Sequence, residues 1–153
     1  MRVYGQITRK MNNFARWPRN LIFQNSMDRK KFMAEVKTKG YLLKDAPDAF
    51  KADREIVLAA VKDYGYALKH TTPELRADKE VVMAAVKNVG GVLEFASDAL
   101  KADKQVVLAA VKQEDFALQF ASSKLQKDKD VKAAAKKGGT RKTRKTRKTR
   151  KLF

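Results

Sequence analysis

A repeat period of 25 residues constrains this chain more than any other feature. Val-Lys pairs recur at that spacing, and an Asp lies eight residues before each Val. The valines are Val36, Val61, Val86 and Val111, and the units that contain them begin at Asp28, Asp53, Asp78 and Asp103. A partial fifth unit begins at Asp128. A fixed period of roughly 20–50 residues is the signature of repeats that stack to share one core.

The first half of each unit has the pattern of a helix. The Asp at unit position 1 is a good N-cap, because its carboxylate can accept hydrogen bonds from free N–H groups of the first turn. A Lys at position 10 lies near the helix end, where the helix dipole favours positive charge. Position 13 follows the helix, and we expect its glycine to adopt a left-handed cap conformation. These glycines are Gly40, Gly65 and Gly90, and the fourth unit has Asp115 instead.

The second half of each unit predicts a shorter helical piece. It carries an apolar face, an N-cap or first-turn residue at position 20, and a last apolar turn. The leucines are Leu43, Leu68, Leu93 and Leu118, the position-20 residues are Pro47, Thr72, Ser97 and Ser122, and the last turns carry Phe50, Leu75, Leu100 and Leu125. Apolar residues surround the first helix almost completely, which indicates burial, whereas the second is half exposed. The sequence therefore predicts an all-α fold, a short α-solenoid of about four helical hairpins over residues 28–137.

The net charge of +18 is concentrated at the two ends of the chain. Residues 1–27 carry five basic residues and no acid, and residues 136–153 carry ten basic residues and no acid. The remaining 108 residues contain 20 basic and 17 acidic side chains. We therefore expect three parts, a basic aromatic segment 1–27, a near-neutral repeat domain 28–137 and a basic tail 138–153.

The tail contains four Thr-Arg-Lys triplets after a Gly-Gly pair. Such a run is typical of a solubilising or nuclear-targeting segment, or of a tether to nucleic acid or an acidic protein surface. The candidate polyanion-binding residues are Lys136, Lys137, Arg141, Lys142, Arg144, Lys145, Arg147, Lys148, Arg150 and Lys151.

The N-terminal segment mixes basic and aromatic residues, a combination that suits stacking on single-stranded nucleic acid. The alternatives are that its apolar residues cover the first repeat, or that the segment is an organelle transit peptide. The candidate contact residues are Arg9, Lys10, Arg16, Trp17 and Arg19.

The repeat motif resembles a known but uncharacterised family. The string DKEVVMAAVKNVGGVLEFASDALKA at 78–102 is similar to repeats catalogued as a domain of unknown function, and the resemblance covers residues 28 to about 135. Similar repeats are abundant in large DNA viruses and in some protists and bacteria, and proteins of large DNA viruses also carry tails similar to this one. The resemblance implies a helical repeat fold and a viral or microbial setting, and we expect a virion component; otherwise we expect an intracellular, not a secreted, protein. It implies no activity.

The sequence does not favour an enzyme. It lacks phosphate-binding, zinc-protease and nucleophile-elbow motifs, it has no Cys, and its one His, His70, stands where other units have Phe. No apolar run is long enough to span a bilayer, and no metal or other cofactor is expected. The leading hypothesis is a non-enzymatic structural or adaptor protein whose repeats contact protein neighbours in an assembly. The alternative is a nucleic-acid-binding or condensing protein that binds DNA or RNA through its tail.

Overall fold

The structure, a computed structural model, describes residues 26–138, and these residues form helices and turns without a strand. The first unit contains α1 (Ser26–Val36), a 3₁₀ helix η1 (Gly40–Asp45) and α2 (Asp48–Lys51). The next three units repeat this order. They contain the long helices α3 (Arg54–Asp63), α5 (Lys79–Asn88) and α7 (Lys104–Gln113), the 3₁₀ helices η2 (Gly65–His70), η3 (Gly90–Phe95) and η4 (Asp115–Phe120), and the short helices α4 (Pro73–Arg76), α6 (Asp98–Lys101) and α8 (Ser123–Lys127). Residues 129–138 form a last helix.

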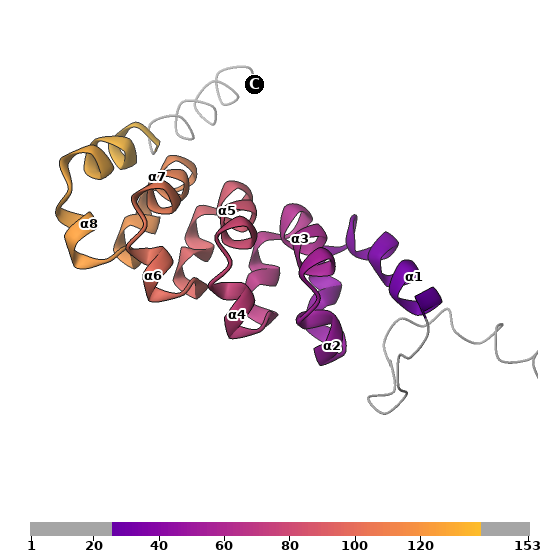
Figure 1. Cartoon of the computed structure of the whole chain (residues 1–153). Helices are drawn as coiled ribbons and strands as arrows, with labels where there is room; N and C mark the ends of the chain where they lie inside the picture. Colours follow the sequence, from indigo (N-terminus) through magenta and orange to yellow (C-terminus); the bar gives the residue numbers. More distant parts are fainter. Residues whose placement is uncertain (1–25, 139–153) are drawn as a thin grey trace, which may run out of the picture.

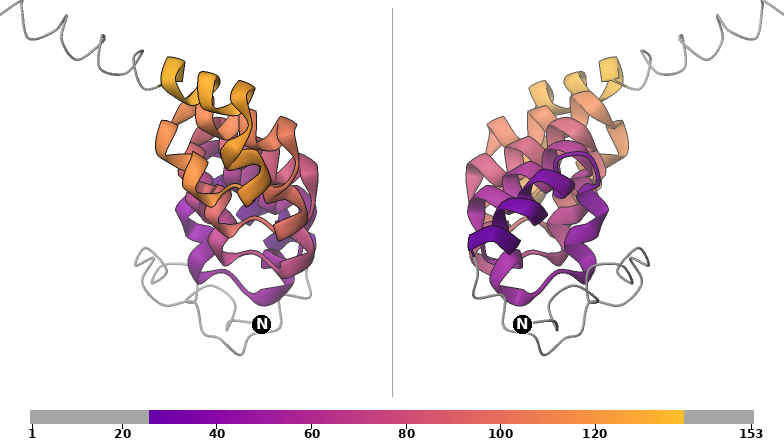
Figure 2. Two further views of the ribbon diagram at one scale, coloured as in Figure 1. Left: turned by 90° about the vertical axis from the view of Figure 1, so that its left-hand side faces the viewer. Right: turned by 90° about the vertical axis from the view of Figure 1, so that its right-hand side faces the viewer.

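The units stack into a short solenoid. The long helices α3, α5 and α7 lie side by side in one layer, and the short helices α2, α4 and α6 lie in the opposite layer (Figure 1). Viewed along the stack, the units follow one another with a progressive offset (Figure 2). This arrangement confirms the all-α helical repeat fold that the 25-residue period predicted.

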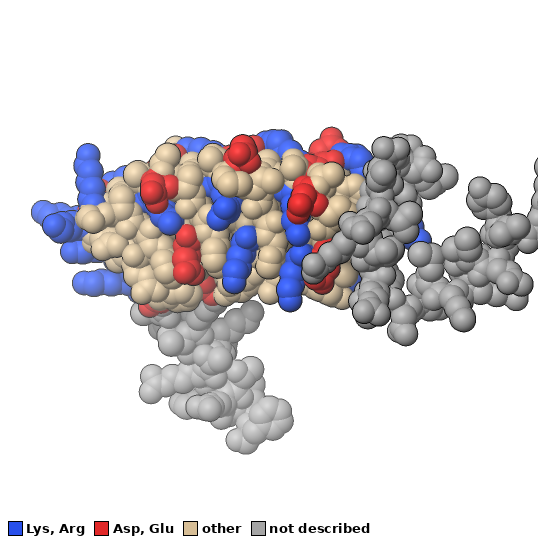
Figure 3. All heavy atoms as spheres, turned by 90° about the horizontal axis from the view of Figure 1, so that it is seen from below, with Lys and Arg blue, Asp and Glu red and all other residues tan. Residues whose placement is uncertain are grey.

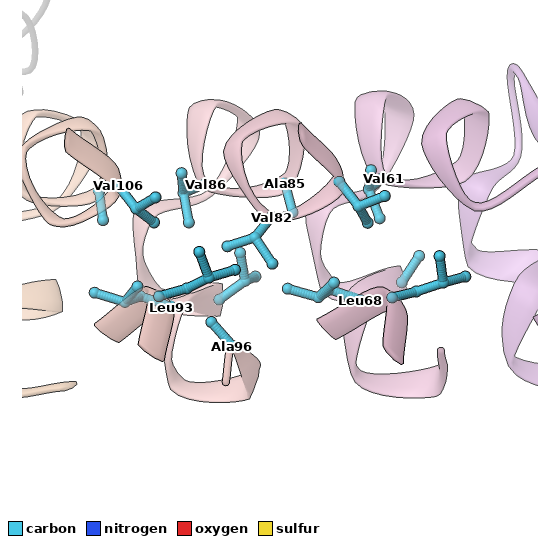
Figure 4. Packing of buried hydrophobic residues seen from close by; sticks show 14 of the residues in the cluster. Val61, Leu68, Val82, Ala85, Val86, Leu93, Ala96 and Val106 are labelled. Atoms are coloured by element: carbon cyan, nitrogen blue, oxygen red, sulfur yellow. The ribbon is translucent and has the colours of Figure 1, made fainter. Parts of the chain in front are cut away.

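One hydrophobic core runs through the described units. Each long helix contributes four buried side chains, at unit positions 4, 5, 8 and 9, and the 3₁₀ helix of the unit contributes others. The side chain of Val82 in α5 points towards the layer of 3₁₀ helices, in which Leu68 of η2 and Leu93 of η3 lie (Figure 4). A fully buried Val or Leu contributes about 1.5–3 kcal/mol before the loss of chain entropy is subtracted. Because these side chains pack between units, no unit has a complete core of its own.

The expected aspartate caps are present in the later units. Asp53, Asp78, Asp103 and Asp128 each accept hydrogen bonds from two backbone N–H groups at the start of the following helix. The first unit differs, because α1 begins at Ser26 and contains Asp28. The prediction that Asp28 is an N-cap is therefore wrong.

The prediction of left-handed glycine caps is also wrong. No described glycine has a positive φ. Glycine stands at position 13 because the next unit leaves no room there. A β-carbon on Gly65 would lie 2.9 Å from the carbonyl oxygen of Ala85, and one on Gly40 or Gly90 would meet the corresponding alanine carbonyl of the following helix.

The second half of each unit is a 3₁₀ helix followed by one α-helical turn. The position-20 residues lie at N-caps, as expected, but none of these side chains makes a capping hydrogen bond. In two units the backbone at this position instead joins its neighbour: Ser97 N–H donates to Arg76 O and Ser122 N–H to Lys101 O, both at 2.9 Å. Position 20 therefore connects units through the main chain.

The last helix packs closely on α7. Gly138, the first residue of the Gly-Gly pair, is buried and is the last described residue of this helix. A β-carbon there would lie 2.6 Å from the carbonyl oxygen of Val111. Asp115, which replaces glycine at position 13 of the fourth unit, is exposed.

Candidate interaction surfaces

A ladder of charged side chains connects the units along one side of the stack. The basic residue at position 2 of each unit reaches the capping Asp of the next unit and the residue at position 3 of that unit. Arg29, Arg54, Lys79 and Lys104 contact Asp53, Asp78, Asp103 and Asp128 at 2.7, 2.8, 2.7 and 3.0 Å. Their second partners are Glu55, Glu80, Gln105 and Asp130. The ladder recurs with the period of the units, so it fixes the register in which neighbours stack.

The ladder also lowers the pKa values of the capping carboxyls. Hydrogen bonds from Arg54 and Lys79 are the main reason that the pKa values of Asp78 and Asp103 lie below their ordinary range, and backbone N–H groups add to the effect. Lys104 does the same for Asp128. Each cap is therefore an ionised carboxylate at neutral pH.

The long helices present a patterned outer face to solvent. Positions 3, 6, 7 and 10 lie on one side of an α-helix, and in α3, α5 and α7 they hold an acid or amide, two half-buried apolar residues and an exposed Lys. The half-buried side chains at position 6 are Met33, Leu58, Met83 and Leu108, and the lysines are Lys37, Lys62, Lys87 and Lys112. We call this surface the outer face. It corrects the expectation that the first helix is buried all round.

Among the described residues of the outer face, the acidic side chains form ion pairs, but the lysines do not. Within the described part of the chain, the ladder pairs the acids at position 3 with basic residues of the preceding unit. The four lysines at position 10 take part in none of these ion pairs. The outer face therefore combines an apolar stripe with an unneutralised row of positive charge.

A groove of about 760 Å³ runs between α3 and α5 on the outer face. Leu58, Met83 and Ala84 supply its apolar part, and Lys62 and Lys87 lie at its border. Lys79, Glu80 and Asn88 complete the lining. The groove can accept an apolar side chain whose neighbours are acidic.

The opposite face, made by the short helices, is a mixture of charges. Figure 3 shows Lys and Arg side chains interspersed with Asp and Glu on this face. Lys51 lies 3.8 Å from Asp48, and Lys101 lies 3.7 Å from Asp98. Two of the described lysines on this face are therefore neutralised within their own short helix.

The structure describes only two of the site residues that the sequence predicted. Lys136 and Lys137 are exposed near the end of the last helix. The candidates Arg9, Lys10, Arg16, Trp17 and Arg19 and the tail residues from Arg141 to Lys151 lie outside the described residues. The structure therefore leaves the two basic ends as sequence-based hypotheses.

His70 is half-buried, and its pKa lies below the ordinary value. Burial is the main cause, and the nearby positive charges of Lys69, Lys51 and Lys44 add to it. Over residues 26–138 no group of three or more His, Cys, Asp or Glu side chains is arranged to hold a metal ion. In the same residues no helix has the length and apolar character needed to cross a membrane.

Sequence reasoning missed the ladder and the outer face. The signal for the ladder was present, because a basic residue follows the unit Asp in every repeat. It was not used, since position 2 of one unit meets positions 1 and 3 of the next only after the units are stacked.

The fold and these surfaces define a helical repeat protein with a continuous core and patterned faces. Residues 32–76 and 78–126 each match the family model described as Domain of unknown function (DUF4116), and together the matches cover more than half of the chain. The chain belongs to this family. No curated protein and no solved structure matches the chain.

Proposed function

We propose that this protein is a non-enzymatic adaptor that holds protein neighbours in an assembly. The observation that carries the proposal is the outer face, where a half-buried apolar stripe runs beside lysines that make no ion pair with described residues. Apolar area supplies affinity, and unpaired charge selects the partner. The matching partner is an acidic amphipathic segment of another protein.

The rigidity of the stack supports the same proposal. The shared core, the backbone links and the ladder hold the outer faces of successive units in one register. A preorganised surface loses little conformational freedom on binding. The basic ends act in this proposal as tethers to a neighbour or to nucleic acid.

We propose a virion of a large DNA virus as the setting of this assembly. The support is the resemblance of the repeats and of the Thr-Arg-Lys tail to proteins of such viruses. Detection of the protein in purified particles, at constant stoichiometry to a capsid protein, is the expected result. Its absence from washed particles would exclude a virion component.

Site-specific photo-crosslinking in the source cells tests the adaptor proposal. A photoreactive phenylalanine analogue at Met83 lies in the groove, whereas the same analogue at Ala99 lies exposed on the short helix α6 of the same unit, on the opposite face of the stack. We expect one discrete protein adduct from position 83 that is lost in the Lys87→Glu variant and absent from position 99. Equal adducts from both positions would contradict the proposal.

The alternative function is binding or condensing of nucleic acid through the tail, and the concentration of ten basic residues in 136–153 favours it. If all ten contacted phosphates of duplex DNA, the logarithm of the affinity would fall with the logarithm of salt with a slope of about −9. Binding of the full chain is compared with that of a variant in which Arg141 to Lys151 are neutral, across roughly 50–300 mM salt. A steep tail-dependent slope together with no crosslink at Met83 would support this alternative.

A further inference from the structure

The exposed aromatic side chains of the array lie in one segment of the repeat. Among residues whose side chains are described, four large hydrophobic residues are exposed, and all occupy position 12 or 14, just before or at the start of the 3₁₀ helix that follows a long helix. They are Tyr41, Tyr64, Tyr66 and Phe116, with exposed fractions of 56%, 41%, 43% and 50%. Isolated exposed apolar residues are ordinary on protein surfaces. Here, however, the exposed aromatic residues are confined to one edge of the stack, and such clustering requires an explanation.

Three of these residues lie at the junction of the first two units. The β-carbon of Tyr64 covers Gly40, since a β-carbon on that glycine would lie 2.9 Å from it. Tyr41 is the next residue in the chain, and the rings of Tyr64 and Tyr66 lie 5.7 Å apart. We call Tyr41, Tyr64 and Tyr66 the tyrosine edge.

The units that carry the tyrosine edge are more basic in this segment than the two units that follow them. Over positions 10–17 the formal charge is +3 in residues 37–44, +1 in 62–69, zero in 87–94 and −1 in 112–119. Phe116, the exposed aromatic outside the edge, has Glu114 and Asp115 beside it in the chain. Aromatic rings and positive charge therefore occur together only in the first two described units.

The 3₁₀ helices place a lysine on the same side as a tyrosine, and the amino group of Lys69 lies 5.9 Å from the ring centroid of Phe95. Side chains three residues apart lie one above the other on a 3₁₀ helix. Lys44 is in this relation to Tyr41 in η1, and Lys69 to Tyr66 in η2. The lowered pKa of His70, which burial causes first and Lys69, Lys51 and Lys44 reinforce, agrees with a positive potential in this region.

We propose that the tyrosine edge, with Lys37, Lys44, Lys62 and Lys69, binds single-stranded nucleic acid, the bases stacking on the rings and the phosphates contacting the lysines. Half-exposed rings offer a face for stacking, which tolerates any base. The lysines supply the salt-dependent contacts to phosphate. Charge complementarity favours this partner over a protein, whose backbone carries no regular negative charge. The site shares Lys37 and Lys62 with the outer face, but its tyrosines and Lys44 and Lys69 do not line the groove, and the site does not involve the tail.

The test uses the full-length chain with Arg141 to Lys151 made neutral, so that the tail does not dominate binding. The probe is a fluorescently labelled oligothymidine of roughly 12 nucleotides, within the usual site size. Tyr64→Leu and Tyr66→Leu keep an apolar side chain and remove the aromatic face, while Tyr66→Phe keeps the ring. Phe116→Leu is the matched control, in the acidic segment 112–119 of the fourth unit. Thermal melts verify that each variant remains folded.

We expect each Tyr→Leu change to weaken binding by roughly fivefold or more, since stacking of one base contributes that much. Lys44→Gln together with Lys69→Gln should weaken binding and reduce its salt dependence. Tyr66→Phe and Phe116→Leu should bind like the parent chain. Three outcomes would overturn the proposal: no binding to the probe, equal binding by the Tyr→Leu variants, and competition by polyglutamate as strong as by unlabelled oligothymidine. The last would indicate an acidic protein as the partner.

Discussion

Gly65 lies so close to the following helix that a β-carbon on it would come within 2.9 Å of the carbonyl oxygen of Ala85. The same relation joins Gly40 to Ala60 and Gly90 to Ala110. Position 13 is therefore the point at which the backbones of neighbouring units meet, and its glycine is a packing residue.

This contact predicts opposite sensitivities for two adjacent glycines. In Gly90→Ala the added methyl meets the backbone carbonyl of Ala110, whereas in Gly91→Ala it meets the outer end of the Phe116 ring, at 2.8 Å. The backbone at Ala110 cannot move without displacing α7, whereas the exposed ring of Phe116 can rotate away from the added methyl group. We expect Gly90→Ala to lower the free energy of unfolding by about 1–3 kcal/mol. Gly91→Ala should change it by less than about 1 kcal/mol.

Urea denaturation followed by circular dichroism measures both variants. Similar destabilisation by the two substitutions would contradict the packing role of position 13. A Gly90→Ala variant that is more stable than the parent chain would contradict this packing role even more strongly.

The buried leucines of the 3₁₀ helices give a second comparison within the repeat. Leu93 is fully buried between units, while Leu118, at the same position of the fourth unit, is half-buried. Leu93→Ala should cost about 2–5 kcal/mol, because it removes contacts and leaves a cavity. Leu118→Ala should cost less, and Lys37→Ala, on an exposed side chain, should cost little. Thermal melts that rank Leu93→Ala no worse than Lys37→Ala would refute the shared core.

The capping aspartates make stability depend on acid pH. The pKa of Asp78 is lowered, first by the hydrogen bond from Arg54 and then by backbone N–H groups, so ionised Asp78 favours the folded state. That stabilisation is complete above the unfolded value of about 3.9 and is lost as the pH falls through the lower folded value. Asn can still cap a helix but does not titrate. Asp78→Asn should therefore show a smaller loss of stability than the parent between about pH 5 and pH 2.

Asp78→Ala provides the matching comparison at neutral pH. It removes the cap and the ladder contact together, and we expect a loss of about 1 kcal/mol. Arg54→Gln removes the ladder contact alone and should cost less. An Arg54→Gln variant that is less stable than Asp78→Ala would mean that the ladder, and not the cap, dominates at this position.

The sequence predicted the parts of this fold that repeat locally. The period, the caps from Asp53 onward and the apolar faces follow from hydrogen bonding and side-chain periodicity within about ten residues. It did not predict the reason for glycine at position 13 or the ladder from Arg54 to Asp78, because both are contacts between units. The helix-end position of Gly65 satisfied the rule for a left-handed cap, yet backbone contact with Ala85 was the actual constraint.

The candidate sites divide in the same way. The basic ends were visible as composition, and their residues lie almost entirely outside the described part of the chain. The tyrosine edge was not visible, since Tyr41 and Tyr64 are 23 residues apart in the sequence and come to the same junction only because Tyr64 packs against Gly40.

His70 adds a second titration, at a higher pH than the aspartates. Burial, reinforced by Lys69, Lys51 and Lys44, lowers its pKa in the folded protein, so protonation favours the unfolded state. At a pH well above about 6.5, the pKa of an unfolded His, His70 is neutral in both states and does not affect stability. As the pH falls from there towards the lower pKa of the folded state, His70 increasingly destabilises the fold. Position 18 holds Phe95 and Phe120 in the next two units, and Lys69 lies 5.9 Å from the Phe95 ring centroid. His70→Phe should therefore remove this titration while keeping a ring that the neighbouring lysine can approach. Denaturation at pH 8 and pH 5 should show a smaller loss of stability for His70→Phe than for the parent chain; equal losses would mean that His70 titrates alike in both states.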